Sequence, residues 1–354
     1  MGRGPGVAAG RVMPGGAVEL ARELVRIESP TGEEGEVGEY LASHLAGLGY
    51  DVQRQQVTPG RFNVFATRGP PVVVLSTHMD TVPPSLPVRD DDTHLYGRGS
   101  ADAKGIIAAQ VAAAERLAAR GERRVALLLV VGEELTADGA QAAAALEPKG
   151  RYLINGEPTD NRMALGHKGM LRVELHARGR AAHSAYPEEG ESAIEPILDA
   201  LERIRRLPLP TDPALGDCTL NVGTIAGGIR PNVIPDACRA ELMFRTVDAT
   251  GELLAAVRAA AGERVEVVVA HDAPPVTLRV LPGFESTLVR FGTDVPWLAA
   301  WGERFLMGPG SIRVAHTDHE RVAKRELEQA VALYQRAVDM LLAEAAGGPR
   351  PARG

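Results

Sequence analysis

Apolar side chains in the first half of the chain follow two patterns that alternate with each other. In some segments they recur every three or four positions, which predicts a helix with one buried face. In others they form short runs rich in Val, Ile and Leu, which predicts a strand. The helical pattern covers residues 17–27, 33–48, 104–120 and 136–146, and the strand pattern covers residues 62–67, 72–77, 125–131 and 152–155. This alternation predicts an α/β layer with a largely parallel sheet.

Two features of these strands indicate how they are connected and covered. Gly69, Pro70 and Pro71 separate residues 62–67 from residues 72–77. Because Gly and Pro favour turns, we expect these two strands to be joined by a turn. Residues 125–131 are apolar without alternation, as in a strand that helices cover on both faces.

The order of elements changes after Gly169. From there the pattern predicts strand, helix, strand, strand, helix and strand, which is the ferredoxin-like order. These elements cover residues 170–178, 191–204, 219–227, 237–247, 251–261 and 264–271. We therefore predict a small α+β domain over residues 169–282, inserted into a larger domain made of residues 1–168 and 283–354.

The last part of the chain predicts a strand at residues 304–307 and a long helix after it. The helix presents an apolar stripe made of Leu327, Val331, Tyr334, Val338 and Leu341. Such a stripe needs an apolar partner, and we expect the first block of the chain to supply it. Residues 1–16 and 347–354 are rich in Gly, Pro and Arg, and we expect them to form loose tails.

Composition narrows the range of partners. The 354 residues are enough for two domains. The 39 Lys and Arg residues against 46 Asp and Glu residues, with 4% aromatic residues, argue against a nucleic-acid partner. No apolar run is long enough to span a membrane, and residues 1–16 lack the apolar core of a secretory signal. The only cysteines are Cys218 and Cys238, so we expect a cytoplasmic protein without disulfide bonds.

Common catalytic signatures are absent. The sequence has no phosphate-binding GxxxxGK[ST] loop, HExxH zinc motif, GxSxG nucleophile turn or CxxC pair. Histidines and carboxylates instead follow the predicted strands, where α/β proteins place their sites. His78 and Asp80 follow the second strand as a metal-binding pair or as part of an exposed turn. Asp102 precedes the helix at residues 104–120 as a metal ligand or as its N-cap.

Three further acids and one histidine complete this set. Glu133 and Glu134 follow the most apolar strand, either as a catalytic base beside a metal ligand or as the acidic first turn of the next helix. Glu157 ends a strand, and its alternative role is a surface acid. His316 could ligate a metal or cap the final helix. Five of these side chains are candidate ligands of types that zinc accepts. Together they indicate a zinc site more strongly than any one of them does alone.

The chain resembles the M20 metallopeptidases and deacylases. The resemblance rests on the motifs STHMDTVP, LYGRGSADAKG, VGEE, INGEPT, GRAAHSAYP, GGIRPNVIP and GPGSIRVAHT, in that order, between residues 17 and 345. It implies a zinc-peptidase-like catalytic domain with an inserted dimerisation domain. It also implies a cis peptide bond between Asp102 and Ala103.

The same resemblance implies two zinc ions, for which cobalt is a possible substitute. Asp102 would bridge them. His78 and Glu157 would complete one metal site, and Glu134 and His316 the other. Glu133 would be the general base that activates water, and Asp80 would orient His78.

Substrate contacts also follow from the resemblance. His183 would stabilise the oxyanion in the other subunit of a homodimer joined through the small domains. Asn232 and Arg245 match positions that hold a substrate carboxylate or line the closed site. Gly310 and Ser311 would add backbone and hydroxyl contacts, although both residues are also common in turns.

These assignments predict a hydrolase that removes an acyl group from an N-acyl amino acid. Glu157, the HKG triplet at residues 167–169 and the GPGSI segment favour acetylornithine deacetylase, and hence amino-acid biosynthesis. The alternatives within the family are a carrier-protein lysine or ornithine hydrolase, a succinyl-diaminopimelate desuccinylase and a carboxypeptidase. Alternatives outside it are a non-catalytic binding paralogue and a serine hydrolase that uses Ser100 or Ser311.

Overall fold

The computed structural model describes residues 16–347, so the predicted tails lie outside the described residues except for Gly16 and Gly347. The chain forms two compact units. The first runs up to Leu165 and continues over Leu278–Thr287 and from Thr293 onward. The second comprises Gly166–Thr277 and Leu288–Gly292. These bounds lie a few residues from the domain boundaries expected at residues 168/169 and 282/283.

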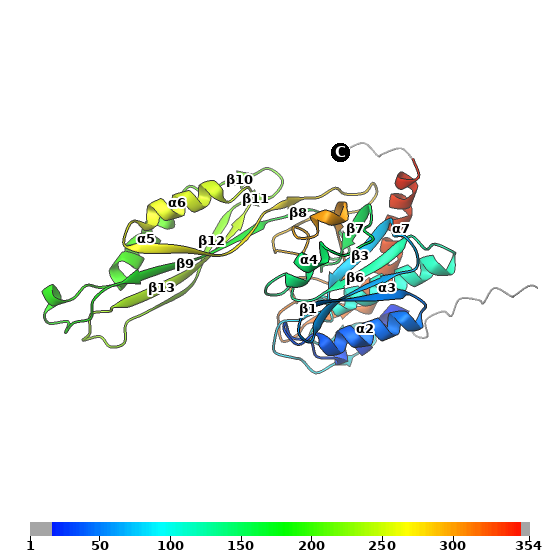
Figure 1. The fold of residues 1–354 in the computed structure, drawn as a ribbon, viewed down its shortest axis with the longest axis horizontal. Coiled ribbons are helices and arrows are strands. Elements are labelled where there is room, and N and C mark those ends of the chain that lie inside the picture. The colour runs from blue at the N-terminus through cyan, green and yellow to red at the C-terminus, as the bar shows by residue number, and fades with distance from the viewer. Residues whose placement is uncertain (1–15, 348–354) are drawn as a thin grey trace, which may run out of the picture. The chain divides into compact units, whose positions relative to one another are not determined.

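The first unit is built on a six-stranded sheet with the order β1-β2-β6-β3-β7-β17 (Figure 1). Neighbours β6 and β3, β3 and β7, and β7 and β17 are parallel, whereas β1 and β2, and β2 and β6, are antiparallel. The predicted α/β class with a largely parallel sheet is therefore confirmed. The strands are β1 (Asp51–Thr58), β2 (Arg61–Thr67), β3 (Val73–His78), β6 (Val125–Val130), β7 (Tyr152–Asn155) and β17 (Glu303–Leu306).

The two strands expected around the Gly–Pro turn are confirmed, and residues 68–72 connect them. Strands β2 and β3 both form, but β6 lies between them in the sheet. Every residue of β3 and β6 is buried, and their parallel pairing places both in the centre of the apolar layer. Strand β1 was not predicted, because its residues DVQRQQVT are mostly polar and it lies at the exposed edge of the sheet.

Five α-helices lie in the described part of the first unit. They are α1 (Gly16–Arg26), α2 (Gly35–Gly47), α3 (Lys104–Ala119), α4 (Asp138–Ala143) and α7 (Lys324–Ala345). The predicted stripe of the last helix is fully buried and packs in the same hydrophobic cluster as residues of α1 and α3, such as Leu24 and Ile107. Helix α4 is shorter than expected, because Ala137 has a left-handed backbone conformation (φ 53°) and Asp138 is tied to Arg61 by a 2.6 Å ion pair.

Short strands form two further, three-stranded sheets in the first unit and in the segments that connect it to the second. A three-stranded sheet has the order β18-β5-β4, and another has the order β15-β8-β16. Their bounds are β4 (Arg89–Asp90), β5 (His94–Tyr96), β8 (Met163–His167), β15 (Val276–Thr277), β16 (Ser286–Val289) and β18 (Arg321–Ala323), and a 3-10 helix, η2, covers Ala299–Trp301.

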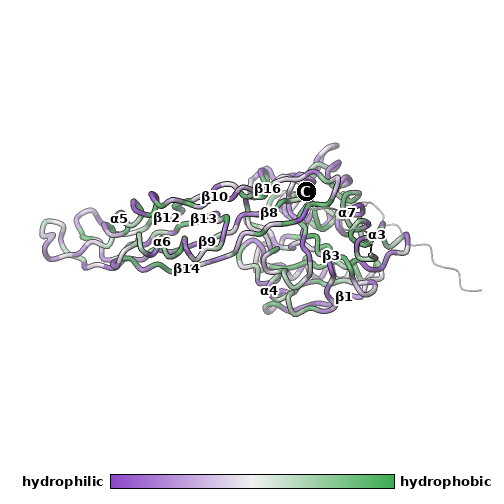
Figure 2. Tube along the Cα trace, turned by 90° about the horizontal axis from the view of Figure 1, so that it is seen from above, coloured by the Kyte–Doolittle hydropathy of each residue, from purple (hydrophilic) through white to green (hydrophobic). Residues whose placement is uncertain are grey.

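The second unit is a four-stranded antiparallel sheet with the order β12-β13-β9-β14 and two helices. The predicted element order is confirmed. Hydrophilic and hydrophobic positions alternate along its strands (Figure 2). Its elements are β9 (Gly169–Arg178), η1 (Pro187–Glu189), α5 (Ile194–Ile204), β10 (Thr211–Asp212), β11 (Gly216–Asp217), β12 (Thr219–Gly227), β13 (Ala237–Thr246), α6 (Gly251–Ala261) and β14 (Val265–Ala273).

Candidate metal centre

The parallel strands of the first unit bring the predicted site residues to one edge of the sheet. His78 is the last residue of β3, Glu133 and Glu134 follow β6 after a short turn, and Glu157 follows β7 by two residues. Because β3, β6 and β7 are parallel, their carboxyl ends lie at the same edge. The loop after β17 adds His316 from a distant part of the sequence.

Asp102 lies at the centre of this group. One of its carboxylate oxygens is 3.0 Å from Nε2 of His78, and the other is 3.4 Å from Nε2 of His316. Nε2 of His316 is also 3.0 Å from the carboxylate of Glu134. The alternative role of Asp102 as a helix cap is wrong, because Ala103 occupies the cap of α3 and makes no side-chain capping hydrogen bond.

These contacts define two groups of donor atoms that share Asp102. The first contains His78, Asp102 and Glu157, and the second contains Asp102, Glu134 and His316. Within each group one donor atom per residue lies within 4.8 Å of the others. An oxygen of Glu157, Oε1, is buried without a hydrogen-bond partner among the described residues. Imidazole and carboxylate donors in such groups suit zinc, so the residues fit the metals that the sequence implied.

Asp80 holds the surrounding loops. Its carboxylate accepts hydrogen bonds from the backbone N–H groups of Glu133 and Glu134, both at 3.1 Å, and from the hydroxyl of Thr31 at 2.7 Å. It also lies 3.4 Å from Nδ1 of His78. Glu133 and Glu134 therefore lie in a turn that Asp80 organises, and not in the first turn of α4, which begins at Asp138.

Burial and charge act strongly on this site. Burial, followed by neighbouring carboxylates, raises the pKa of Glu157 well above its ordinary value. Burial likewise raises the pKa of Glu133. Burial opposes a charge on His78, but hydrogen bonds to Asp102 and Asp80 raise its pKa overall. Hydrogen bonds to Asp102 and Glu134 raise the pKa of His316 to about 10. A cation bound among these carboxylates would favour their charged forms and so oppose the effect of burial.

Glu320 is a positioning residue that sequence analysis missed. Its Oε1 accepts the backbone N–H groups of Ala101 and Asp102, both at 3.1 Å, and its Oε2 pairs with Arg98 at 2.7 Å. The buried pair of Glu320 and Arg98 thus fixes the backbone at Asp102. No spacing in the sequence relates Glu320 to Arg98, because they lie 222 residues apart.

Replacing Arg98 with Met is expected to lower the free energy of unfolding by about 3–5 kcal/mol, because Glu320 then remains buried without its ionic partner. Urea titration of the purified protein measures this change. The control is Arg116→Met, which breaks the exposed ion pair with Glu328 (3.0 Å). That substitution is expected to change the free energy by less than about 1 kcal/mol. Equal losses in the two variants would contradict a structural role for the Arg98–Glu320 pair.

Asp294 is a second residue that sequence analysis missed. It is 1% exposed, and neither carboxylate oxygen has a hydrogen-bond partner among the described residues. Burial raises the pKa of Asp294 to about 7, and its charge acts on Glu133 and Glu157. The only signal available in the sequence was an acid between Thr293 and the apolar residues that follow.

Gly310 and Ser311 lie beside the segment that precedes Asp102. Gly310 has a φ of +83°, and an added Cβ would lie 3.2 Å from the side chain of Ala101. Ser311 forms an isolated β-bridge with Thr159. Gly310 thus permits a close approach of two backbone segments. The expected cis peptide bond between Asp102 and Ala103 is also confirmed.

The other expected substrate residues belong to the second unit. His183 forms a β-bridge with Val233, and its Nδ1 accepts the backbone N–H of Ala185 at 3.1 Å. The carbonyl of Asn232 accepts the N–H of Ser184 at 3.0 Å. His183 and Asn232 therefore lie on adjoining loops of that unit. Arg245 lies near the end of β13.

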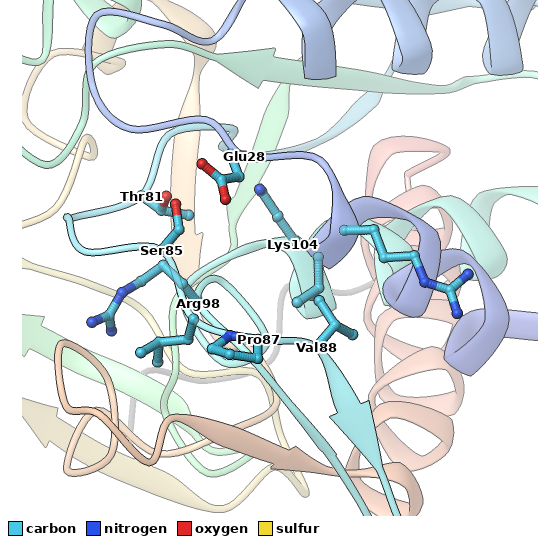
Figure 3. A pocket seen from close by; sticks show the side chains of 10 residues that line it. Glu28, Thr81, Ser85, Pro87, Val88, Arg98 and Lys104 are labelled. Carbon is cyan, nitrogen blue, oxygen red and sulfur yellow. The ribbon is translucent and has the colours of Figure 1, made fainter.

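A separate cavity of about 350 Å³ opens next to Asp80 and Asp102 along the chain, at Thr81 and Lys104 (Figure 3). Nζ of Lys104 donates a hydrogen bond to the carbonyl of Ile27, and burial lowers the pKa of Lys104 to about 8. Arg98 and Glu28 also line this cavity. None of the proposed metal ligands does, so the cavity is distinct from the metal centre.

The serine-hydrolase alternative finds no support in the described residues. The hydroxyl of Ser100 is buried without a hydrogen-bond partner, and no hydrogen bond joins Ser311 to a histidine. A serine nucleophile needs an adjacent base to remove its proton.

The cysteines Cys218 and Cys238 are both free and buried. No described helix is long and apolar enough to cross a membrane.

Two curated relatives align with most of this chain. A probable carboxypeptidase of Emericella nidulans is 39% identical over 92% of this chain and 89% of its own length. A probable carboxypeptidase of Aspergillus fumigatus is 39% identical over 91% of this chain and 86% of its own.

Solved structures share the fold. A tripeptidase from Staphylococcus aureus aligns with a TM-score of 0.78 and 22% identity, over 92% of this chain and 97% of that one. An M20 family metallo-carboxypeptidase from Sulfolobus solfataricus aligns with a TM-score of 0.75 and 17% identity, over 93% and 99% of the two chains.

The family model for peptidase family M20/M25/M40 matches residues 74–340, which span β3 through most of α7 and include every residue of the two metal-binding groups. Enzymes of this family are metal-dependent hydrolases, in keeping with donor groups that share one carboxylate. On the match of its sequence, its fold and its cluster of histidines and acids, this chain belongs to peptidase family M20/M25/M40.

Proposed function

We propose that this protein is a dinuclear metallopeptidase that hydrolyses the amide bond next to a terminal carboxylate in short peptides or N-acyl amino acids. The observation that supports it best is the position of Asp102 in both groups of donor atoms. A carboxylate shared in this way could bind two metal ions at once. Paired metal ions are typical of several classes of hydrolase, aminopeptidases among them.

This proposal favours carboxypeptidase activity over acetylornithine deacetylase activity. The relatives at 39% identity are named probable carboxypeptidases, and the comparisons give no support for the acetylornithine specificity or the biosynthetic role expected from the motifs. Peptides are accordingly the first substrates to test. A cytoplasmic location stays a prediction.

The residues present divide between two metal positions. His78 and Glu157 would hold one ion with Asp102, and Glu134 and His316 would hold the other. Zinc, or cobalt in its place, would lower the pKa of a bound water and polarise the substrate carbonyl. Asp80 would keep the ring of His78 in its ligating orientation through Nδ1, from which its carboxylate is 3.4 Å away.

Glu133 is the residue that moves the proton in this proposal. Its carboxylate would take a proton from the attacking water and deliver it to the nitrogen of the leaving amine. Burial favours the protonated form of Glu133, so the proton can be held between the two steps. The backbone N–H of Glu133 is bound to Asp80, which fixes the base beside the ligand Glu134.

Residues of the second unit would bind the substrate. Arg245 offers a planar guanidinium that can hold a carboxylate through two hydrogen bonds, and Asn232 would add an amide contact. Gly310 and Ser311 of the first unit would contribute backbone and hydroxyl contacts. His183 would donate a hydrogen bond to the oxyanion that forms from the substrate carbonyl.

His183→Ala is expected to reduce kcat by about 10²–10³-fold, because the oxyanion loses a hydrogen-bond donor. Metal content should stay at the wild-type level. Steady-state kinetics and elemental analysis of the same preparation measure both quantities. The control is His176→Ala, which removes a histidine of the same unit that pairs with Glu174 at 3.0 Å. Release of metal from the His183 variant would mean that its role is misassigned.

We also propose a homodimer through the second unit. Strand β12 is an edge strand with mostly exposed residues, and Ile225 on it is 53% exposed. Apolar residues of α5 and β12 line the adjacent groove, among them Leu198, which is 48% exposed. An unpaired strand edge beside apolar side chains suits a second copy of the same surface, because a two-fold interface is self-complementary.

Ile225→Asp is expected to convert the dimer into a monomer, since it places a charge in the apolar part of the interface. Sedimentation velocity gives the mass in solution. Val268→Asp on the opposite edge strand, β14, is the matched control, because Val268 is 39% exposed and lies outside the groove. A monomeric wild-type protein, or a dimer that Ile225→Asp leaves intact, would contradict this interface.

The substrate class is tested with a panel of compounds. It contains tripeptides, acyl-glutamates, acetylornithine, succinyl-diaminopimelate and a carrier-protein–lysine conjugate, each assayed with zinc or cobalt and again after EDTA treatment. We expect release of the C-terminal residue from peptides, its loss with EDTA and its recovery with metal. Hydrolysis of acetylornithine alone would restore the deacetylase hypothesis. A metal-bound protein that hydrolyses nothing would favour the non-catalytic paralogue, and activity that resists EDTA would contradict metal dependence.

A further inference from the structure

The cavity at Thr81 and Lys104 has walls from three separate segments of the first unit. Val25 lies on α1, Thr81 and residues 85–88 follow β3, and Lys104 is the first residue of α3. None of them is a metal ligand or a substrate residue of the function proposed above. The volume of about 350 Å³ lies in the range of small-molecule sites, which is roughly 300–1,000 Å³. The cavity can therefore hold a ligand of its own.

Lys104 is the buried hydrogen-bond donor of the cavity. It is 1% exposed, and Gly99 leaves room for its stem, because an added Cβ at Gly99 would lie 2.9 Å from Cδ of Lys104. Nζ of Lys104 donates a hydrogen bond to the carbonyl of Ile27. An ammonium group has three N–H donors, and residues 16–347 supply no other acceptor for Nζ. Two donors of a buried group thus remain for a ligand to bind.

Glu28 supplies the opposite charge. Its carboxylate and the amino group of Lys104 point toward each other in the cavity (Figure 3). Within the described part of the chain, however, no hydrogen bond or ion pair joins these two groups, and none binds the carboxylate of Glu28 to another residue. The hydroxyl group of Ser85 points to the same part of the cavity (Figure 3). An acceptor and a donor therefore face one space without satisfying each other.

The two arginines that line the cavity already have acidic partners. Arg98 lies 2.7 Å from Glu320, and Arg26 lies 2.8 Å from Glu23. The charged groups left for a ligand are thus one carboxylate and one amino group. The carboxylate would repel a free anion such as phosphate, and a simple cation would leave the amino group without an acceptor. The polar part of the cavity fits a ligand that carries both charges.

Apolar side chains line the rest of the cavity. They belong to Val25, Leu86, Pro87 and Val88. Figure 3 shows Pro87 and Val88 on the side away from the carboxylate of Glu28. An aliphatic group of the ligand would be removed from water there, which favours binding. The ligand that matches both parts of the cavity therefore combines a zwitterion with an apolar side chain.

We propose that this cavity is a second binding site, which takes a free α-amino acid with an apolar side chain such as leucine. The α-ammonium group donates to the carboxylate of Glu28, Lys104 donates to the α-carboxylate, and the aliphatic side chain lies against Val88. Hydrogen bonds between charged groups are about twice as strong as those between neutral groups. The site goes beyond the peptidase function, because its residues take no part in hydrolysis.

Calorimetric titration of the metal-loaded Glu133→Gln protein with L-leucine measures this site without hydrolysis. We expect one leucine per chain that still binds after EDTA treatment, because no proposed metal ligand lines the cavity. Two analogues test the polar contacts. Leucic acid has a hydroxyl in place of the ammonium group, and leucinamide has an amide in place of the carboxylate. Each is expected to bind about 10- to 100-fold more weakly than leucine, as for the loss of one charge-assisted hydrogen bond. Inorganic phosphate is expected not to bind.

Two further variants place the bound leucine in the cavity. Adding Glu28→Gln is expected to weaken leucine binding by about 10- to 100-fold and to remove most of the preference over leucic acid, because the ammonium group loses its carboxylate partner. Ser85→Trp, which fills the cavity from an exposed position, is expected to abolish binding. The matched control is Glu33→Gln, since Glu33 is an exposed acid of the same segment that does not line the cavity.

Leucine bound as a product at the metal centre would behave differently. Its binding would be lost with EDTA and would not respond to Glu28→Gln or Ser85→Trp, and either result would overturn the cavity site. Equal affinity for leucine and both analogues, or binding of phosphate at the same position, would also overturn it. In the background that retains Glu133, Glu28→Gln and Ser85→Trp are expected to leave the turnover of peptides unchanged, which separates this site from the catalytic one.

Discussion

Glu133→Gln is expected to lower kcat by about 10²–10⁴-fold while the protein keeps its metal. Gln has the shape of Glu but cannot accept and return a proton through a carboxylate. The contact that positions residue 133 comes from its backbone N–H, 3.1 Å from Asp80, so the substitution preserves the local fold. Stopped assays with peptide substrate measure turnover, and elemental analysis of the same sample measures metal content.

The design of this experiment separates chemistry from binding. Glu285→Gln, which replaces an acid of the same unit that is 82% exposed in its side chain, is the control and is expected to retain full activity. The affinity of the Glu133 variant for peptide should be close to that of the wild type. An active Glu133→Gln enzyme would remove Glu133 from the role of general base. A variant that loses metal would assign it to the metal ligands instead.

Asp102→Ala is expected to have the largest effect on metal binding, because Asp102 is the residue common to both donor groups. The variant should lose both ions and all measurable activity, whereas His316→Ala should keep about one of two ions per chain. The first group, formed by His78, Asp102 and Glu157, does not contain His316. Elemental analysis after dialysis against buffer without metal gives the two stoichiometries.

Folding must be checked in parallel, because Asp102 is buried and its backbone is bound to Glu320. His319→Ala provides a control for the loss of an exposed histidine from the same loop, since the side chain of His319 is 62% exposed and pairs with Asp318. An Asp102 variant that folds and retains two ions would show that this carboxylate is not shared. An identical metal content in the Asp102 and His316 variants would contradict two distinct positions.

Local patterns were sufficient for most individual elements. The 3.6-residue period of Leu327, Val331, Tyr334, Val338 and Leu341 specifies the buried face of α7, and all five side chains are fully buried. Residues 152–155 form β7 with the expected bounds. Periodicity succeeds here because burial of one face is a local property of the helix or strand. It failed for β1, whose polar edge position leaves little apolar signal.

Pairing between strands required the tertiary structure. The Gly–Pro turn connects β2 to β3 along the chain, but it does not show that β6 lies between them in the sheet. Hydrophobic residues of β6 pair with both neighbours, Leu127 with Ala66 on one side and with Leu75 on the other. Sheet order depends on which apolar strands come together over long sequence separations, and turn residues alone do not specify it.

Some features of the site were determined by the sequence, and others only by the tertiary structure. The sequence by itself determined the types of residue at the strand ends, the family resemblance and the apolar faces of the helices, because each depends on residues that are close along the chain. The tertiary structure alone decided that Asp102 joins His78 to His316 and that Glu320 holds the backbone of Asp102. It also decided that no group among residues 16–347 forms a hydrogen bond with the buried carboxylate of Asp294. These relations depend on through-space distance and on exclusion of water, which arise only when distant segments pack together.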